Sequence, residues 1–117
     1  MNNRHFTRVN YSVGASISYG NEVVICTTDN LSLHGMYLKT GHNIPLKIPV
    51  HVTVYHSNSS SFKVNARVVR VEENGVGLQI QDLNVDSFVK LRRLVSDQSK
   101  EKMQIMQETY KMLSCIS

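Results

Sequence analysis

Two arginines near the start of the chain could together bind an anionic group. Arg4 and Arg8 are four residues apart, in a segment without apolar periodicity before Val9, so we expect them to lie on a mobile N-terminal arm. A guanidinium group donates in a fixed fork that fits phosphate and the acceptor edge of guanine. This spacing is common by chance, however, and alone it favours two solvated surface arginines. It therefore predicts a binding site only together with a second element.

The turn Asn30-x-Ser32-x-x-Gly35 is that second element. The Ser32 hydroxyl can donate or accept, and Asn30 offers both a carbonyl and an amide. Gly35 permits a backbone conformation or a close approach that a side chain would block. An ordinary Asx-type turn would account for Asn30 and Gly35 but not for Ser32. The turn is therefore a candidate binding element.

A mainly β domain must position these residues, because apolar and polar residues alternate from Tyr11 to Ile80. The predicted strands cover residues 13–19, 22–28, 36–40, 50–55, 62–71 and 76–80. Gly20-Asn21 and Asn74-Gly75 are typical of tight hairpins, and residues 29–35 form the turn that carries the candidate site. About six short strands in so small a domain favour a closed or nearly closed sheet, because open edges invite aggregation.

Helical periodicity replaces this alternation after Leu83. Asn84 or Asp86 could cap the first helix, whose apolar positions are Phe88, Leu91, Leu94 and Val95. A second helical stretch follows, either continuous with the first or separated from it near residues 96–99. We therefore expect three regions: a mobile arm with the arginine motif at 1–10, a β-barrel at 11–83, and a helical region at 84–117.

The second helical stretch carries an apolar stripe of Met103, Met106, Tyr110 and Leu113. Two interpretations stay open, because the first helix would already cover the barrel opening. The stripe could be a surface for a partner protein or the seam of a homo-oligomer. Alternatively, the helix folds back on the same domain.

Bulk properties are those of one globular domain. The chain has 117 residues, of which 41% are hydrophobic and 19% charged, and its net charge of +4 favours an anionic partner. No apolar run is long enough to span a membrane. No secretory signal is visible, so we expect a cytoplasmic protein. Cys26 and Cys115 are expected to be reduced thiols, since two separated cysteines make neither a disulfide framework nor a metal cluster.

Other functions fit the sequence less well. An enzyme is the weakest alternative, because Ser32 and His34 have no acid partner at an informative spacing. The histidines show no metal-binding pattern; they are His5, His34, His42, His51 and His56. We therefore expect no catalytic residue, metal or cofactor. A small basic β-barrel could bind single-stranded nucleic acid by stacking bases on Tyr11, Tyr19, Tyr37 and Tyr55, but strand tyrosines are more often packing residues.

Together, the Arg4-x-x-x-Arg8 pair and the Asn30-x-Ser32-x-x-Gly35 turn resemble the PilZ domain family, receptors for the bacterial second messenger cyclic di-GMP. The resemblance extends to about Val95 and includes the predicted closing strands. It implies a six-stranded antiparallel β-barrel with a C-terminal helix, in agreement with the strand count above. Within this resemblance, a PilZ-like adaptor that acts by protein contacts without nucleotide is the remaining alternative.

The resemblance also implies roles for the motif residues. Arg4 and Arg8 would bind guanine and phosphate from the arm, while Asn30, Ser32 and Gly35 would line the barrel side. The family often has Asp where this chain has Asn30, so affinity could be lower, although Asp29 could partly compensate.

The expected mechanism is a transition from disorder to order, in which cyclic di-GMP draws the arm onto the barrel and creates a new surface. The chain begins three residues before Arg4. We therefore expect the receiver of the signal to be an effector protein, a second copy of the chain, or the C-terminal helical region. Motility, surface polysaccharide and adhesion are outputs that the resemblance implies.

Overall fold

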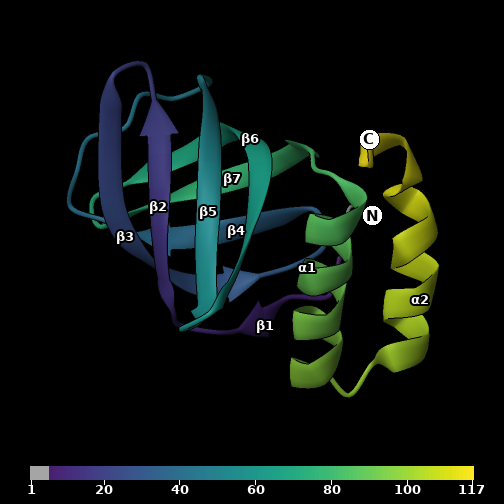
Figure 1. Ribbon diagram of the computed structural model, residues 1–117. Coiled ribbons are helices and arrows are strands. Elements are labelled where there is room, and N and C mark those ends of the chain that lie inside the picture. Colours follow the sequence, from purple (N-terminus) through teal and green to yellow (C-terminus); the bar gives the residue numbers. More distant parts are fainter. Residues whose placement is uncertain (1–5) are drawn as a thin grey trace.

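The computed structural model describes residues 6–117 and contains a β-barrel followed by two helices (Figure 1). The strands are β1 Val9–Asn10, β2 Gly14–Tyr19, β3 Glu22–Leu31, β4 Gly35–Lys39, β5 Pro49–Ser57, β6 Ser60–Glu72 and β7 Gly75–Asp82. The helices are α1 Val85–Gln98 and α2 Lys102–Lys111, with a short 3-10 turn, η1, at Leu113–Cys115. The predicted six-stranded antiparallel barrel is confirmed.

The barrel closes through a pairing between strands that flank the candidate turn. The hydrogen-bonded order is β1-β3-β2-β5-β6-β7-β4, and β3 also pairs with β4. That last pairing turns the open order into a ring of six strands and leaves β1 as an extra strand beside β3. Closure leaves few free strand edges.

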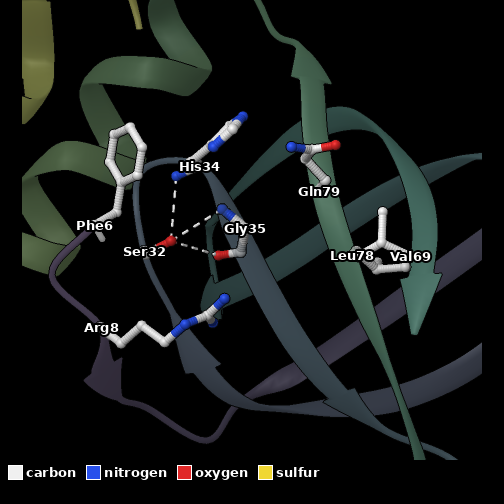
Figure 2. A pocket seen from close by; sticks show the side chains of 8 residues that line it. All are labelled: Phe6, Arg8, Ser32, His34, Gly35, Val69, Leu78 and Gln79. Atoms are coloured by element: carbon white, nitrogen blue, oxygen red, sulfur yellow. Dashed lines mark hydrogen bonds between the residues drawn. The ribbon is translucent and has the colours of Figure 1, made fainter. Parts of the chain in front are cut away.

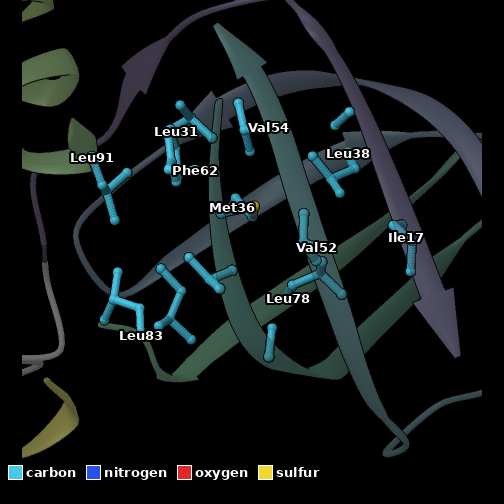
Figure 3. Close-up of a cluster of buried hydrophobic side chains, with 14 of the residues drawn as sticks. Ile17, Leu31, Met36, Leu38, Val52, Val54, Phe62, Leu78, Leu83 and Leu91 are labelled. Carbon is cyan, nitrogen blue, oxygen red and sulfur yellow. The ribbon is translucent and has the colours of Figure 1, made fainter. Parts of the chain in front are cut away.

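The barrel interior is filled by one face of every strand, as the alternation predicted (Figure 3). Ile17, Leu38 and Val52 are fully buried, and Phe62, Leu78 and their neighbours are nearly so. Leu91 of α1 adds to the same cluster from outside the sheet. Helix α1 therefore packs over the barrel, as its apolar periodicity indicated.

The prediction that residues 29–35 form a turn is wrong for its first half. Strand β3 continues to Leu31, and only Ser32–His34 lie between β3 and β4. Asn30 pairs with Asn10 of β1 on one side and with Tyr37 of β4 on the other, after a register shift following Thr28. These long-range pairings override the turn propensity of Asp29 and Asn30. Strand β1 itself, two residues long, was not predicted.

The helical region forms two helices, which answers the question left open by the sequence. Helix α1 ends at Gln98 and α2 begins at Lys102. Of the two candidate caps, Asn84 caps α1, because its side chain accepts a hydrogen bond from the Ser87 amide at 2.7 Å. Figure 1 shows α2 beside α1, on the side of α1 away from the barrel.

Helix α2 folds back on the domain through one face and leaves its predicted apolar stripe exposed. Ile105 and Met112 are buried. The stripe residues are between 49% and 73% exposed: Met103, Met106, Tyr110 and Leu113. Packing on the same domain is therefore confirmed for one face, while a partner surface at the stripe stays a prediction. Within residues 6–117, no helix has the length and apolar character that crossing a membrane requires.

Candidate functional site

The Ser32 hydroxyl organises the turn between β3 and β4 (Figure 2). It accepts hydrogen bonds from the amides of His34 and Gly35 at 3.2 and 3.0 Å, and it lies 3.1 Å from the Gly35 carbonyl oxygen, to which it donates. The Ser32 amide donates to the same carbonyl at 2.8 Å. Ser32 is only 2% exposed. Ser32 therefore fixes the backbone that presents His34 and Gly35.

Gly35 is required by a close approach of strands β4 and β7. A Cβ atom at this position would lie 2.7 Å from the Leu78 carbonyl oxygen and 3.5 Å from Nη2 of Arg8. Any side chain would therefore push β7 away and intrude on the guanidinium group. Because Gly35 has no side chain, the space beside Arg8 in the pocket stays free.

Arg8 reaches from the arm to the end of β3, just before the turn, although it lies 22 residues earlier in the sequence. Its Nη1 donates to Oδ1 of Asn30 at 2.6 Å. Partial burial lowers the pKa of Arg8 from its ordinary value, and the nearby charge of Arg70 lowers it further. Both effects raise the free energy of the Arg8 cation, and an anion bound beside it would offset them.

A pocket of about 570 Å³ lies where the arm, the turn and the barrel wall meet. Its size falls in the range of small-molecule sites. It is lined by Phe6, Arg8, Ser32, His34, Gly35, Val69, Leu78 and Gln79. Figure 2 shows Arg8 and the turn on one side of this space and Gln79 and Val69 on the other. The arrangement offers a cation, backbone and side-chain polar groups, and flat apolar surface.

His34 and Phe6 form one wall of the pocket. Their ring centroids are 5.0 Å apart, with planes tilted by 52°. Burial lowers the pKa of His34, and the charge of Arg8 lowers it further. The imidazole is therefore held toward its neutral form, in which it can stack on a planar base or donate one hydrogen bond.

The structure brings four of the five predicted site residues together. Arg8, Ser32 and Gly35 line the pocket, and Asn30, which is not part of the lining, accepts a hydrogen bond from Arg8. Arg4 lies outside the described residues, so its predicted role stays a prediction. Within residues 6–117, no group of three or more His, Cys, Asp or Glu side chains is placed to hold a metal ion.

Asp29 is less available to the site than the sequence suggested. Oδ1 of Asp29 lies 3.5 Å from Nζ of Lys39, and Oδ2 of Asp29 accepts a hydrogen bond from the side-chain nitrogen of Asn30 at 3.4 Å. Compensation for the missing charge at Asn30 would therefore act through the Asn30 side chain, because Asp29 already has a cation partner.

Sequence reasoning missed several pocket residues: Phe6, His34, Val69, Leu78 and Gln79. Phe6 and His34 lie at unspecified positions within the two motifs, which was an available signal. Gln79 pairs with Gly35 across β4 and β7. Its place in the pocket depends on the register between strands that are more than forty residues apart, for which the sequence carried no signal.

Comparison with protein families and known structures agrees with this fold. A model of the PilZ domain family matches residues 2–97. The PilZ domain of CeSA from a cellulose-synthesizing bacterium is similar with a TM-score of 0.64 and 18% identity, covering 77% of this chain and 95% of that one. A comparison with curated proteins gave no match.

Two further solved structures share the fold at low sequence identity. The PilZ domain of YcgR from Escherichia coli with c-di-GMP has a TM-score of 0.70 at 12% identity, covering 96% of this chain and all of that one (100%). The inhibitor of motility MotI/DgrA from Bacillus subtilis has a TM-score of 0.70 at 13% identity. The match covers 83% of this chain and 51% of the MotI chain, so this chain spans about half the length of MotI. Because the family model matches most of its length, the chain belongs to the PilZ domain family.

Proposed function

We propose that this chain is a cyclic di-GMP receptor rather than an enzyme. It binds the messenger with Arg4, Arg8, Asn30, Ser32 and Gly35 and passes the signal on through contacts of its N-terminal arm. The observation that carries the proposal is the meeting of Arg8 with the Ser32 turn in one pocket. Family membership and the neighbour described with c-di-GMP support the choice of ligand.

The pocket chemistry suits a ligand with two guanines and two phosphates. An arginine fork can engage N7 and O6 of guanine together, a contact worth about 1 to 3 kcal/mol of discrimination. Arg8 supplies a cation in the pocket lining, and the nearby charge of Arg70 lowers the pKa of Arg8. Phe6 and the His34 ring offer faces on which a base could stack.

The proposed output is a change in the arm. The described part of the arm already contacts the barrel, since β1 pairs with β3 and Arg8 bonds to Asn30. Binding of the messenger by Arg4 and Arg8 would order the arm further and alter the surface that an effector protein, or a second copy of the chain, contacts. We expect this to take place in the cytoplasm.

Calorimetry with cyclic di-GMP, beside GTP and cyclic di-AMP, tests the ligand. We expect Arg4→Ala and Arg8→Ala each to weaken binding by about tenfold to a hundredfold, taking a lost charge-assisted contact as about 1.5 to 3 kcal/mol. Arg93→Ala removes the same charge from an exposed position on α1 and should leave affinity unchanged. Wild-type affinity in both arm variants would refute the site.

The same titration separates the alternatives. A nucleotide-independent adaptor would bind none of the three ligands. A general single-stranded nucleic-acid binder would bind unrelated oligonucleotides in a salt-sensitive manner, without preference for cyclic di-GMP. One of its candidate stacking residues already has a partner on its ring: the guanidinium carbon of Arg70 lies 5.3 Å from the centroid of Tyr37.

Hydrogen exchange tests the arm mechanism separately. We expect the first ten residues to gain protection when cyclic di-GMP is added, because ordering lowers the rate at which their amides open to solvent. Unchanged exchange in protein that demonstrably binds the ligand would reject the ordering step while leaving the binding site intact.

A further inference from the structure

Helix α2 holds the arm through a buried carboxyl group that the proposed binding site does not use. Glu108 is fully buried, with 0% exposure. Its Oε1 accepts from the Thr7 amide at 2.9 Å, and its Oε2 accepts from the Thr7 hydroxyl at 2.6 Å. Among the residues that the structure describes, both of its partners therefore belong to the residue next to Arg8.

A second contact joins the same face of α2 to the pocket wall. Nζ of Lys111, one turn beyond Glu108, lies 5.5 Å from the ring centroid of Phe6. Phe6 in turn contacts His34 of the Ser32 turn. The arm thus lies between α2 and the turn, and each of three consecutive arm residues has a defined partner: Phe6, Thr7 and Arg8.

Helix α2 is itself anchored to the domain at several points. Nε of Arg92 on α1 donates to the Thr109 hydroxyl at 3.0 Å. Beyond α2, the Leu83 amide donates to the Cys115 carbonyl and the Ser117 amide to the Leu83 carbonyl, both at 3.0 Å. Since Leu83 directly follows β7, the tail returns to the end of the barrel. Glu108 is therefore presented from a fixed support.

A carboxyl group is a poor choice at this position if its role is only packing. Burying it carries a desolvation cost, and apolar replacement of buried charged groups is often neutral or stabilising. A carboxyl group can, however, position the arm, because its two acceptor oxygens match the two Thr7 donors. Two hydrogen bonds fix both the position and the orientation of Thr7 relative to α2. Arg8 is the next residue, and its guanidinium group depends on that placement.

We propose that Glu108 is a positioning residue for cyclic di-GMP binding and that α2, which lies beyond the family match at residue 97, sets the affinity of the pocket through Thr7. This inference rests on the proposed function. Coupling between two sites is reciprocal, so the ligand must in turn stabilise the attachment of α2. Binding of the ligand in the pocket is therefore expected to change the stability of helix α2 on the domain.

The test is a titration of the full chain with cyclic di-GMP. Glu108→Gln replaces a carboxylate by a neutral amide, whose NH2 group can donate to the Thr7 hydroxyl but makes a weaker contact than a carboxylate oxygen does. We expect about tenfold weaker binding, the equivalent of one hydrogen bond. Glu101→Gln makes the same chemical change at an exposed position preceding α2 and should bind as the wild type does. Circular dichroism and thermal unfolding establish that each variant is folded.

Variants of Thr7 keep the test decisive if Glu108→Gln fails to fold. Thr7→Val removes the hydroxyl at nearly constant shape and should weaken binding, whereas Thr7→Ser keeps both donors and should restore it. In the double variant Thr7→Val/Glu108→Gln, the two losses should be less than additive. Hydrogen exchange adds a readout that a purely structural role would not move: α2 amides should gain protection with ligand in the wild type and not in Glu108→Gln.

The outcomes separate this inference from the proposed function. Wild-type binding together with equal affinity in folded Glu108→Gln or Thr7→Val overturns the positioning role alone. Failure of the wild type to bind cyclic di-GMP overturns the proposed function and, with it, the inference. Weaker binding in both variants, with Glu101→Gln unaffected, supports both.

Discussion

The buried hydroxyl of Ser32 contributes to the site by shaping the backbone of the turn, in addition to any contact with a ligand. It satisfies the His34 and Gly35 amides from inside the turn, so its first task is to shape the backbone. The sequence predicted Ser32 as a binding residue because an ordinary turn did not need it. The geometry gives it a structural role that presents the neighbouring residues to the pocket.

Replacing Ser32 by Ala should destabilise the fold and weaken binding together. Two amides would lose their acceptor in a buried turn, at a cost of about 1 to 3 kcal/mol. Urea unfolding measures the loss, and calorimetry with cyclic di-GMP measures the change in affinity. Ser12→Ala, at an exposed position, is the matched control and should change neither. A stable Ser32→Ala variant would show that water satisfies the turn instead.

His34 should make stability depend on pH. Burial and the Arg8 charge lower its pKa in the folded state, while the unfolded chain keeps the ordinary value of about 6.5. Above that value His34 is neutral in both states and contributes nothing. As pH falls below it, the unfolded state binds the proton more readily, so the free energy of unfolding decreases.

Urea unfolding at pH 7.5 and pH 5.5 checks this dependence. The decrease in stability between the two should be smaller in His34→Gln than in the wild type, because the variant has no proton to bind at this position. The exposed His42 supplies the control, since His42→Gln should retain the wild-type decrease. Identical pH profiles for His34→Gln and wild type would contradict the assignment.

At the scale of elements, local pattern predicted strands well and strand ends poorly. Alternation located six of the seven strands, because it reports which face of each strand is buried. It missed β1 and the last three residues of β3, whose strand conformation depends on pairing between distant segments: β1 pairs with the end of β3, which also pairs with β4. Such pairing depends on where the arm lies in space, and two residues are too few to show a period.

Helix α1 offers a prediction at this scale. Asn84→Ala removes the acceptor for the Ser87 amide and should cost about 1 kcal/mol of unfolding free energy. Asn84→Asp keeps an acceptor oxygen at the N-cap and should retain most of the stability. Thermal or urea unfolding compares the three proteins. Equal losses in both variants would indicate that the Asn84 amide group, rather than the cap, is what matters.

At the scale of the molecule, the candidate site is a product of barrel closure. The β3–β4 pairing closes the ring and brings the Ser32 turn to the end of the barrel, where the arm crosses it. The sequence could predict a closed sheet from strand number, and motif spacing pointed to Arg8 and the turn. It could not predict the Glu108–Thr7 contact, which joins residues 101 positions apart, because no periodicity links the two ends of a chain.

A ligand that binds where arm, turn and barrel meet must stabilise the whole domain, because unfolding separates all three. At a concentration of one hundred times Kd, binding adds about 2.7 kcal/mol to the free energy of unfolding. For a domain of this size that corresponds to a rise in Tm of roughly 10 °C. Thermal unfolding with cyclic di-GMP should show this rise, and the same concentration of GTP should not.

The specificity of that rise distinguishes a built site from general attraction to a basic protein. The net charge of +4 would draw any polyanion, but such binding weakens steeply with salt. We expect the cyclic di-GMP shift to persist at elevated salt and to disappear in Arg8→Ala at the same ligand concentration. Arg93→Ala is the control, because it lowers the net charge as much as Arg8→Ala does and should keep the shift. An equal shift with an unrelated oligonucleotide, lost on adding salt, would instead assign the effect to net charge and reject the pocket.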